Sequence, residues 1–445
     1  MLINLETGEI EKPEIRLSVS DADDLFKVEG LDRNVDYEVH LNMHRPRPEV
    51  LNNEALWAIN NVVSLTVTTY RPEYDEGRLL ANLCRFTRLR RLEVWFQCYG
   101  NTRVGEEISP HQDPLFDCLD AMKNLESITL RPFHGAFPEV IGELEGLTEL
   151  DITAEFTSLP ENIGKLKHLK TLKVTNAKLS SLPESIFRLS NLEHLYLRTP
   201  LVEEIPEEVR RLKQLRRLEL FGMDALAAFP RALGELEHLA RMDVSYMPAL
   251  PVPKGELVHL DTLKVEKVED ISPVGQYTGV SYLSLEKIKN ETFPAGFSRL
   301  QNLASFYIED SGQLKGFPDG LPPFPNLRVV SFIKTGLKEI PGFLLKSTRL
   351  ESLSIENAQV ARLPEGLSNL SNLKNLSLPG NNIEVLPASL MDLRSCSRMD
   401  FHSNNIREIA PEILNYRGET SLRISIGGNP VRKEGFENNS TIIIQ

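Results

Sequence analysis

The chain has 445 residues, of which 41% are hydrophobic and 25% are charged, and its formal net charge is -13. The acidic balance argues against nucleic acid as the main partner, because binding phosphates rewards a basic surface. A local basic stretch, Arg85 to Arg91, is the best argument for binding to nucleic acid, but we interpret it as the solvated face of one repeat. No run of about 18 apolar residues is present, so the sequence predicts no membrane span.

The N-terminus and the cysteines predict a cytoplasmic location. Met1 to Glu14 is polar and acidic, without the basic and apolar segments of a secretory signal. The four cysteines are Cys84, Cys98, Cys118 and Cys396. They form no CxxC pair, no cluster at either end and no zinc-ligand spacing, so we expect free thiols in a reducing compartment and no structural metal.

Residues 1–60 are not repetitive and are predicted to form an N-terminal capping region. Val35 to Met43 alternates strictly between apolar and polar residues, which is typical of a β-strand, and Ile15 to Val19 alternates similarly. Glu54 to Asn60 is predicted to be a short helix. The first repeat would otherwise expose its apolar edge to water, so we expect these strands to extend the sheet of the repeats.

Beyond residue 60 the pattern L-x-x-L-x-L recurs to near the C-terminus, mostly every 23 residues. Clear copies begin at Leu147, Leu169, Leu192, Leu215, Leu350 and Leu373. One such unit cannot bury its own apolar face, so neighbouring units must stack and the period predicts a solenoid. We expect about 16 turns over residues 61–431, the first two of them irregular, and a C-terminal tail or cap at 432–445.

Each regular unit contains two predicted elements. The L-x-x-L-x-L stretch is expected to be a strand whose alternate leucines point inward. An apolar residue and a proline follow, as in Leu159-Pro160, and proline suits the first position of a helical turn because its φ is fixed. The chain returns through a helical segment such as Ile163 to Leu169. The sequence thus predicts an α/β solenoid, or horseshoe, with a parallel sheet on its concave face and short helices or 3-10 turns on its convex face.

These residues resemble the leucine-rich repeat family. The closest subtype is the 23-residue intracellular one, which occurs in Ras-group proteins and in many bacterial proteins. The resemblance covers about residues 62 to 431, and one unit, from Asp270 to Pro273 onward, is similar to the shorter internalin-type repeat. The family usually places an asparagine three residues after the last strand leucine. Here only Asn381, Asn404 and Asn429 match, so a perfectly regular curvature is not expected.

One insertion interrupts the early turns. The second apolar strand positions of two successive units, residues 92 and 128, are 36 residues apart instead of the common 23. The extra residues are expected in the polar stretch Gly100 to Glu107, soon after the strand that carries Trp95. A loop there could overhang the concave face or be a disordered excursion, since long insertions are often functional.

Catalytic motifs are absent from the sequence. It contains no Gly-rich phosphate loop, no HExxH, no EF-hand loop and no nucleophile elbow. Asp21, Asp23 and Asp24 form an acidic cluster that we interpret as a solvated turn. We therefore expect neither an enzyme nor a cofactor or metal site.

The outward strand positions carry the candidate binding residues. Stacked strands lie about 4.8 Å apart, so equivalent positions form columns across the concave face. The mid-strand column contains Glu93, Tyr196, Glu219, Asp243 and Tyr307. The next column contains Trp95, Arg131, Arg198, Phe221, Glu266, Glu286, Glu309, Ile333, Glu356 and His402. Two neighbourhoods follow from these columns, one rich in aromatic and arginine residues and one rich in glutamate.

The first neighbourhood is the candidate protein-binding surface. It comprises Trp95, Arg131, Tyr196, Arg198 and Phe221, with Tyr246 just beyond. Exposed Trp, Tyr and Arg dominate protein interfaces because they bury a large area and keep a polar tip. The alternative is that these side chains pack on one another along the sheet and simply stabilise it.

The second neighbourhood is a glutamate strip formed by Glu266, Glu286 and Glu309, with Tyr307 beside it. Like charges on neighbouring strands repel by some tenths of a kcal/mol, so the strip indicates a basic partner or a cation. Alternatively, Lys267 and Lys287 follow two of these glutamates and neutralise them locally.

The sequence hypothesis is a non-enzymatic cytoplasmic scaffold or adaptor that binds a protein or peptide on its concave face. The alternative is a bacterial effector or surface-recognition protein that uses the same scaffold to bind a host or foreign protein. Nothing in the sequence indicates the oligomeric state.

Overall fold

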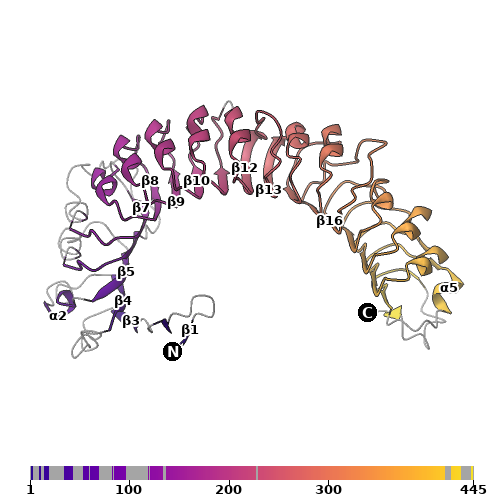
Figure 1. Cartoon of the computed structure of the whole chain (residues 1–445). Coiled ribbons are helices and arrows are strands. Elements are labelled where there is room, and N and C mark those ends of the chain that lie inside the picture. Colours follow the sequence, from indigo (N-terminus) through magenta and orange to yellow (C-terminus); the bar gives the residue numbers. More distant parts are fainter. Residues whose placement is uncertain are drawn as a thin grey trace, which may run out of the picture. The chain divides into compact units, whose positions relative to one another are not determined.

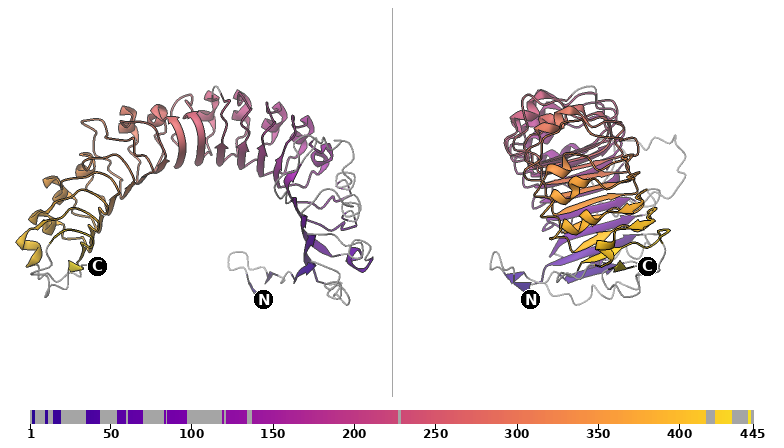
Figure 2. Two further views of the ribbon diagram at one scale, coloured as in Figure 1. Left: turned by 180° about the vertical axis from the view of Figure 1, so that it is seen from behind. Right: turned by 90° about the vertical axis from the view of Figure 1, so that its right-hand side faces the viewer.

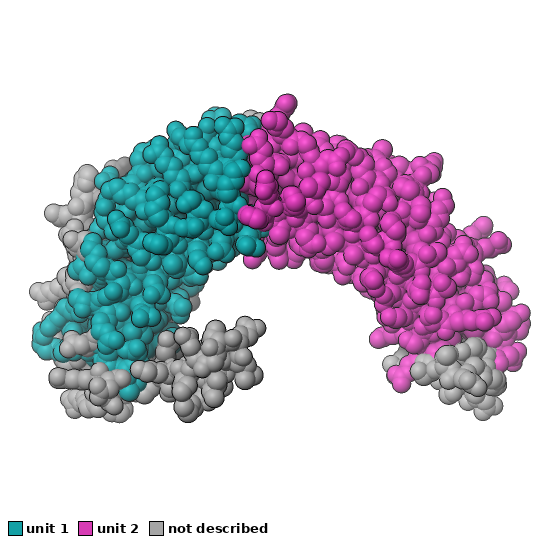
Figure 3. Space-filling view, viewed as in Figure 1, with its two compact units in different colours: residues 1–216, 225–228 teal, residues 217–224, 229–445 magenta. Residues whose placement is uncertain are grey.

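The computed structural model describes most of the repeat array and parts of the N-terminal region. The described residues are 2–3, 10–11, 15–19, 35–43, 54–59, 61–69, 83, 85–96, 119, 121–133, 137–226, 229–415, 422–431 and 442–443. They fall into two compact units, residues 1–216 with 225–228 and residues 217–224 with 229–445, coloured separately in Figure 3. The predicted insertion at Gly100 to Glu107 lies outside the described residues, as do the acidic cluster at Asp21 to Asp24 and three of the four cysteines.

Unit 1 is built on a parallel sheet in which the strands follow one another in chain order (Figure 1). The strands are β3 (Ile15–Val19), β4 (Tyr37–Met43), β5 (Val62–Thr69), β6 (Arg91–Phe96), β7 (Ser127–Phe133), β8 (Glu149–Ala154), β9 (Thr171–Asn176) and β10 (His194–Arg198). Strands β3 and β4 come from the first 60 residues, so this region extends the sheet as expected. An antiparallel pair, β1 (Leu2–Ile3) and β2 (Ile10–Glu11), precedes them, and the predicted helix is the short α2 (Glu54–Trp57).

Unit 2 continues the same pattern with its own parallel sheet. The strands are β11 (Arg217–Phe221), β12 (Arg241–Ala249), β13 (Thr262–Asp270), β14 (Tyr282–Glu286), β15 (Ser305–Glu309), β16 (Val329–Ile333), β17 (Ser352–Glu356), β18 (Asn375–Ser377), β20 (Arg398–Asp400), β22 (Arg423–Ser425) and β23 (Ile442–Ile443). A second, two-stranded sheet pairs β19 (Val385–Leu386) with β21 (Glu408–Ile409).

The return segments are 3-10 turns, and they lie on the side of each unit opposite to its sheet (Figures 1 and 2). In unit 1 they are η2 (Glu139–Glu143), η3 (Glu161–Lys165), η4 (Glu184–Arg188) and η5 (Glu207–Arg211). In unit 2 they are η6 (Arg231–Glu235), η7 (Ser272–Gln276), η8 (Ala295–Arg299), η9 (Leu344–Lys346), η10 (Glu365–Asn369) and η11 (Ala388–Asp392), followed by one α-helical turn, α5 (Pro411–Leu414). The parallel sheet and the 3-10 turns confirm the predicted fold class.

The position predicted for the prolines is wrong by one residue. Pro160 is the N-cap of η3, with φ -74° and ψ 150°, and does not occupy the first position of the turn. Its carbonyl accepts the N–H of Ile163 at 3.2 Å, which is the first hydrogen bond of the turn. The fixed φ of proline therefore holds an extended residue whose carbonyl starts the turn, and the same geometry recurs at Pro183 and Pro206.

The core of each unit is the stack of inward leucines. Strand β9 alternates half-buried and buried residues, with Leu172 and Val174 buried. The register pairs Leu172 with Leu150 on one side and with Leu195 on the other, so each inward side chain packs on its equivalents. In unit 2, phenylalanines form part of the core: the ring centroid of Phe297 lies 4.7 Å from those of both Phe293 and Phe324.

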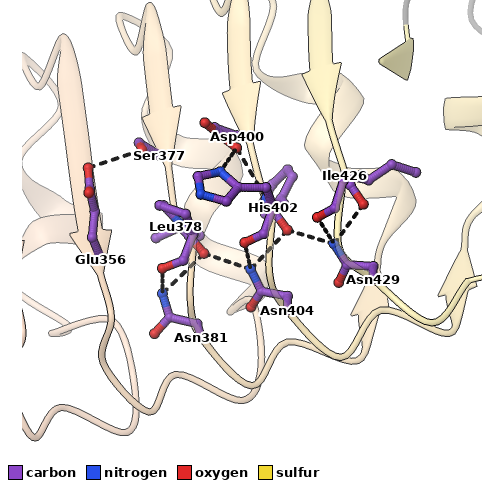
Figure 4. A network of polar contacts seen from close by, with 12 residues as sticks. Glu356, Ser377, Leu378, Asn381, Asp400, His402, Asn404, Ile426 and Asn429 are labelled. Carbon is purple, nitrogen blue, oxygen red and sulfur yellow. Dashed lines mark hydrogen bonds and ion pairs between the residues drawn. The ribbon is translucent and has the colours of Figure 1, made fainter. Parts of the chain in front are cut away.

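The three matching asparagines form a ladder at the ends of the last strands of unit 2 (Figure 4). Asn404 Nδ2 donates to the carbonyls of Leu378 at 2.8 Å and Phe401 at 3.0 Å, and its Oδ1 accepts the N–H of Ile383 at 3.1 Å. Asn381 makes the equivalent contacts one turn earlier, and Asn429 makes them one turn later. Each side-chain amide thus hydrogen-bonds to backbone N–H and carbonyl groups that have no strand partner beyond the end of the strand.

Turns without this asparagine satisfy their backbone differently. At Met247 and Val268 the strands β12 and β13 run on, and the register continues through Met247↔Val268 and Ala249↔Asp270. Ser311 replaces asparagine on another turn, where its Oγ accepts the N–H of Ile288 at 3.2 Å. Asn176, one residue earlier than the expected site, donates to Phe156 O at 2.8 Å. The departures from the repeat pattern therefore change which groups cap the strands and leave the stacking intact.

A second asparagine ladder lies where the chain enters the strands. Its members are Asn124, Asn191, Asn302, Asn326 and Asn372. Each donates its Nδ2 to a backbone carbonyl of the preceding turn, as from Asn372 to Thr348 O at 2.8 Å. This ladder explains the N-L-x-x-L spacing of many units, because the amide ties one entry loop to the next.

Candidate functional site

In unit 1 the register brings Trp95 and Arg131 side by side on β6 and β7. The Arg131 guanidinium lies 5.4 Å from the centroid of the Trp95 ring, a cation–π arrangement. Asp151 on the next strand binds the same guanidinium through both oxygens, with Nε to Oδ1 at 3.2 Å. Trp95 Nε1 also donates to Glu93 Oε2 at 3.4 Å. The pair is thus a packed and charge-compensated element that is still half exposed.

Two other members of the predicted first neighbourhood lie in unit 1, but not beside that pair. Tyr196 and Arg198 lie on β10, three strands beyond β7, and both point to the outward side of the sheet, with Arg198 exposed. Phe221 and Tyr246 belong to unit 2, on β11 and β12. Within unit 1, strands β8 and β9 therefore separate Tyr196 and Arg198 from the Trp95–Arg131 pair.

Tyr246 belongs to a ladder of left-handed residues at the end of the outward column. A positive φ recurs at Tyr246 (55°), Lys267 (50°), Lys287 (54°), Asp310 (48°), Lys334 (52°), Asn357 (51°) and Ser403 (55°), and Gly380 (64°) takes this place on the turn before Ser403. A side chain in this conformation costs about 1 kcal/mol relative to glycine, so each turn tolerates a small local strain. Three lysines of this ladder, Lys267, Lys287 and Lys334, make aromatic or ion-pair contacts with neighbouring side chains.

The glutamate strip is in register and is partly neutralised by this ladder. Glu266 pairs with Glu286, and Glu286 pairs with Glu309. Lys287 forms an ion pair with Glu286 and lies 3.5 Å from Glu266. The hydrogen bond to Glu286 raises the pKa of Lys287 above its ordinary value. Local neutralisation, one of the two interpretations of the sequence, thus operates at these two glutamates.

Lys267 takes a different partner from the one the sequence indicates. Its Nζ lies 4.3 Å from the ring centroid of Tyr246 and donates to the Tyr246 hydroxyl at 3.0 Å. Tyr246 is 44% exposed, so this cation–aromatic contact lies at the surface. Farther along the ladder, Lys334 Nζ lies 2.9 Å from Asp310 Oδ1.

A group of interface-type side chains lies on β11 to β15 and was not predicted as a group. We name it the arginine–tyrosine cluster, and its members are Arg217, Glu219, Arg241, Asp243, Lys264, Tyr282 and Tyr307. The register places Arg217 beside Arg241 and Glu219 beside Asp243. It also places Asp243 beside Lys264, and Ser284 beside Tyr307. All seven residues lie on the outward surface of unit 2.

Two buried carboxylates hold the arginines of the cluster in place. Asp243 is only 6% exposed and accepts Nε and Nη2 of Arg241 at 3.0 and 2.9 Å. Arg217 Nη2 lies 3.5 Å from the same carboxylate, and its Nε lies 2.8 Å from Glu219 Oε1 without the alignment of a hydrogen bond. The hydrogen bonds to Asp243 raise the pKa of Arg241. Because each guanidinium is anchored from below, its exposed edge is fixed in position.

The tyrosines extend the cluster as a flat aromatic surface. The rings of Tyr282 and Tyr307 have centroids 5.1 Å apart and planes inclined by 31°. Lys264 Nζ lies 5.8 Å from the Tyr282 ring. Burial and the neighbouring Tyr307 raise the pKa of Tyr282, so its hydroxyl is neutral and can donate or accept a hydrogen bond.

The sequence contains a signal for this cluster at the first outward position of the strands. Arg217, Arg241 and Tyr282 occupy the first outward position of each strand, just before the buried leucine or methionine. The two predicted columns contain only the second and third outward positions, so they include Glu219, Asp243 and Tyr307 without these partners. The three columns together place two arginines next to two carboxylates.

The cluster offers no metal site and no nucleophile. Within the described ranges, no three His, Cys, Asp or Glu side chains converge as metal ligands would. None of the helices in the described part of the chain combines the length and apolar character needed to cross a bilayer. The chemistry available at this surface is therefore ion pairing, hydrogen bonding and aromatic packing.

Comparison with known proteins agrees with the repeat geometry. A family model described as a leucine-rich repeat region matches residues 138–247. The repeats in this span are leucine-rich repeats. The resemblance drawn from the sequence is thereby confirmed, and the leucine-rich repeats run through β8 to β12 in the matched span. No curated protein sequence matches the chain.

Solved structures with leucine-rich repeats share the fold. A leucine-rich repeat protein of Leptospira interrogans is 23% identical and has a TM-score of 0.59, covering 88% of this chain and 90% of that one. The Toll–Spatzle complex of Drosophila matches at 17% identity and a TM-score of 0.59, covering 94% and 64%. The TLR13–ssRNA13 complex matches at 16% identity and a TM-score of 0.61, covering 93% and 68%. At these identities the likeness shows the fold alone.

Proposed function

We propose that the chain is a non-enzymatic scaffold that binds another protein, and that the arginine–tyrosine cluster is its main contact surface. The observation that carries this proposal is the anchoring of Arg217 and Arg241 by the buried carboxylates Glu219 and Asp243, next to a packed tyrosine pair. Arginine and tyrosine are the residues that most often dominate protein interfaces.

The rigidity of the cluster supports binding because it lowers the entropy lost on association. Immobilising a flexible side chain at an interface costs about 0.5–1.5 kcal/mol. Arg241 already makes two hydrogen bonds to Asp243, so much of its freedom is lost before any partner arrives. Its guanidinium edge and the exposed faces of Tyr282 and Tyr307 can then contact a partner without further ordering.

The charge of the cluster favours a protein over a nucleic acid. Three cationic groups, Arg217, Arg241 and Lys264, lie beside two carboxylates, and the whole chain has a net charge of -13. A surface of nearly balanced charge matches a mixed-charge protein surface, whereas phosphate binding rewards an excess of unpaired cations. Toll in its complex with Spatzle, a structure of the same fold, also supports binding of a protein. TLR13 in its complex with ssRNA13 shows that proteins of this fold can bind RNA as well.

The test compares proteins captured by the full chain with those captured by variants. Tyr282→Ala with Tyr307→Ala removes the aromatic surface, and we expect at least about a tenfold loss of specifically enriched partners, since each 1.4 kcal/mol is tenfold in affinity. Val252→Ala with Val258→Ala is the matched control, because these side chains are 49% and 56% exposed and lie outside the strands.

Quantitative mass spectrometry of the captured proteins, followed by direct affinity measurement with the purified partner, gives the readout. Equal capture by both double variants would refute the cluster as the contact surface. The same assay with Tyr196→Ala and Phe221→Ala tests the other predicted aromatic residues, and turnover of any substrate by the purified chain would contradict the non-enzymatic assignment.

A further inference from the structure

A second charged surface lies on the last turns of unit 2, separate from the arginine–tyrosine cluster. We name it the basic strip, and its members are Arg328, Arg349, Lys374, Arg398 and Arg423. Arg349, Arg398 and Arg423 are exposed, and the side chains of Arg328 and Lys374 are 59% and 60% exposed. Arg328, Arg349 and Lys374 line a depression together with Glu351 and Asn372.

The ladder of backbone hydrogen bonds sets the order of the strip. Glu351 N donates to Arg328 O at 2.8 Å, and Lys374 N donates to Glu351 O at 2.8 Å, so these three residues stack on successive turns. One residue further along each strand, the register places Arg398 directly beside Arg423. The basic strip therefore runs across the strands from the start of β16 to β22.

The strip carries much more positive than negative charge. Among the described residues, Glu351 is the carboxylate that pairs with members of the strip, and it lies 2.7 Å from Lys374 Nζ and 2.8 Å from Arg328 Nη1. Hydrogen bonds to Lys374 and Arg328 lower the pKa of Glu351. Arg349 Nη1 donates to the amide oxygen of Asn326 at 3.4 Å. Among the residues that the structure describes, no carboxylate lies within 4.0 Å of Arg398 or Arg423.

This excess is unexpected in a chain with a net charge of -13. Like charges that face each other on neighbouring strands are destabilising, and Arg398 beside Arg423 is such a pair. Anionic groups from outside the chain would relieve the repulsion. Guanidinium groups bind carboxylates with two parallel hydrogen bonds, so arginine is well suited to recognise them.

We propose that the basic strip binds a short acidic segment of a partner protein. From β16 to β22 the sheet advances by four strands, or about 19 Å at 4.8 Å per step, which matches about six residues of extended chain. The segment lies across the strands and pairs its carboxylates with Arg349, Arg398 and Arg423, which lack a carboxylate partner among the described residues.

An acidic peptide fits the strip better than a nucleic acid of similar charge. Binding to single strands relies on aromatic side chains that stack on bases. No member of the strip is aromatic, and neither are Ser352 and Asn375, which lie between its members in the register. The acidic remainder of the chain also repels a polyanion that is longer than the strip.

The experiment measures fluorescence anisotropy of labelled probes with the full chain at about 50 mM and about 500 mM salt. The probes are a peptide with about six consecutive Asp and Glu residues, its Asn and Gln counterpart, and single-stranded oligothymidine of equal charge. Arg398→Glu with Arg423→Glu is the test variant. Lys338→Glu with Arg362→Glu is the matched control, because it makes the same charge change at exposed residues of unit 2 outside the strip.

We expect the acidic peptide to bind at low salt, to bind at least about tenfold more weakly to the test variant, and to bind the control variant within about threefold of the unaltered chain. Equal weakening by the two variants would show attraction by overall charge and would overturn the proposal. Tighter binding of oligothymidine, binding of the Asn and Gln peptide, or no binding at low salt would also overturn it. The result is independent of the arginine–tyrosine cluster, because both variants leave that cluster intact.

Discussion

Removal of the Asn404 side chain is the sharpest test of how the repeats are held together. Asn404 is 5% exposed, and its amide serves the carbonyls of Leu378 and Phe401 and the N–H of Ile383. A third carbonyl, of His402, lies 3.3 Å from the same Nδ2 (Figure 4). An amide has two N–H donors, so Asn404→Ala removes about three hydrogen bonds and leaves buried backbone groups unsatisfied.

Each such bond contributes about 1 kcal/mol net, so we expect the variant to lose about 3 kcal/mol from the free energy of opening of the last turns. This corresponds to an opening equilibrium raised by on the order of 100-fold. Asn405→Ala is the matched control, because Asn405 is the next residue and its side chain is exposed. We expect the control to change the same free energy by less than about 0.5 kcal/mol.

Native-state hydrogen exchange is the suitable assay, because a solenoid opens locally and need not unfold as a whole. Faster exchange should be confined to β18, β20, β22 and the turns beside them, while β11 to β15 keep their protection. Equal effects of the two substitutions, or loss of protection spread over all of unit 2, would refute the view that the asparagine ladder stabilises its own turns.

Three other predictions follow from the described contacts. Phe297→Ala empties the centre of the phenylalanine core and should lower the free energy of unfolding of its turns by about 3–5 kcal/mol in urea denaturation, and a loss under about 1 kcal/mol would contradict that packing. Burial raises the pKa of the Cys396 thiol to about 11. In a variant with the other three cysteines replaced by serine, iodoacetamide at about pH 8 should therefore label Cys396 only as the chain unfolds. Rapid labelling of the folded chain would show an accessible thiolate. Hydrogen bonding to Lys315 lowers the pKa of Glu291 below 4.5. The stability that this ion pair contributes is therefore complete above pH 4.5 and is lost as the pH falls through the pKa of the folded state. Glu291→Gln should make the acid-induced decline in the free energy of unfolding shallower, and an unchanged decline would contradict a stabilising pair.

Much of the candidate surface could be expected from the sequence, but its grouping could not. The alternation of the strands is sufficient to assign Trp95, Tyr196 and Glu286 to the outward side of the sheet. Which neighbours they meet depends on where each side chain turns after leaving the sheet. Lys267 illustrates this, because a positive φ directs it to the ring of Tyr246 and not to the glutamate that precedes it.

The ion pairs of the arginine–tyrosine cluster could not be expected from the sequence either. Arg217 and Asp243 are 26 residues apart in the chain, and no local pattern links them. They lie within 3.5 Å because β11 and β12 pair in a register that places equivalent positions side by side. These ion pairs are strengthened by the burial of the carboxylates of Glu219 and Asp243, and that burial depends on the surrounding side chains.

The period of the leucines determined by itself that the chain stacks parallel strands with turns on the other side. A short unit with one apolar face has no other way to remove that face from water. The tertiary structure alone decided how strands end where asparagine is missing, with longer strands at β12 and β13 and serine at Ser311. It also decided which charges are paired and which remain exposed, because ion pairing depends on distances of a few ångströms between turns, and the sequence specifies only the order in which the turns occur.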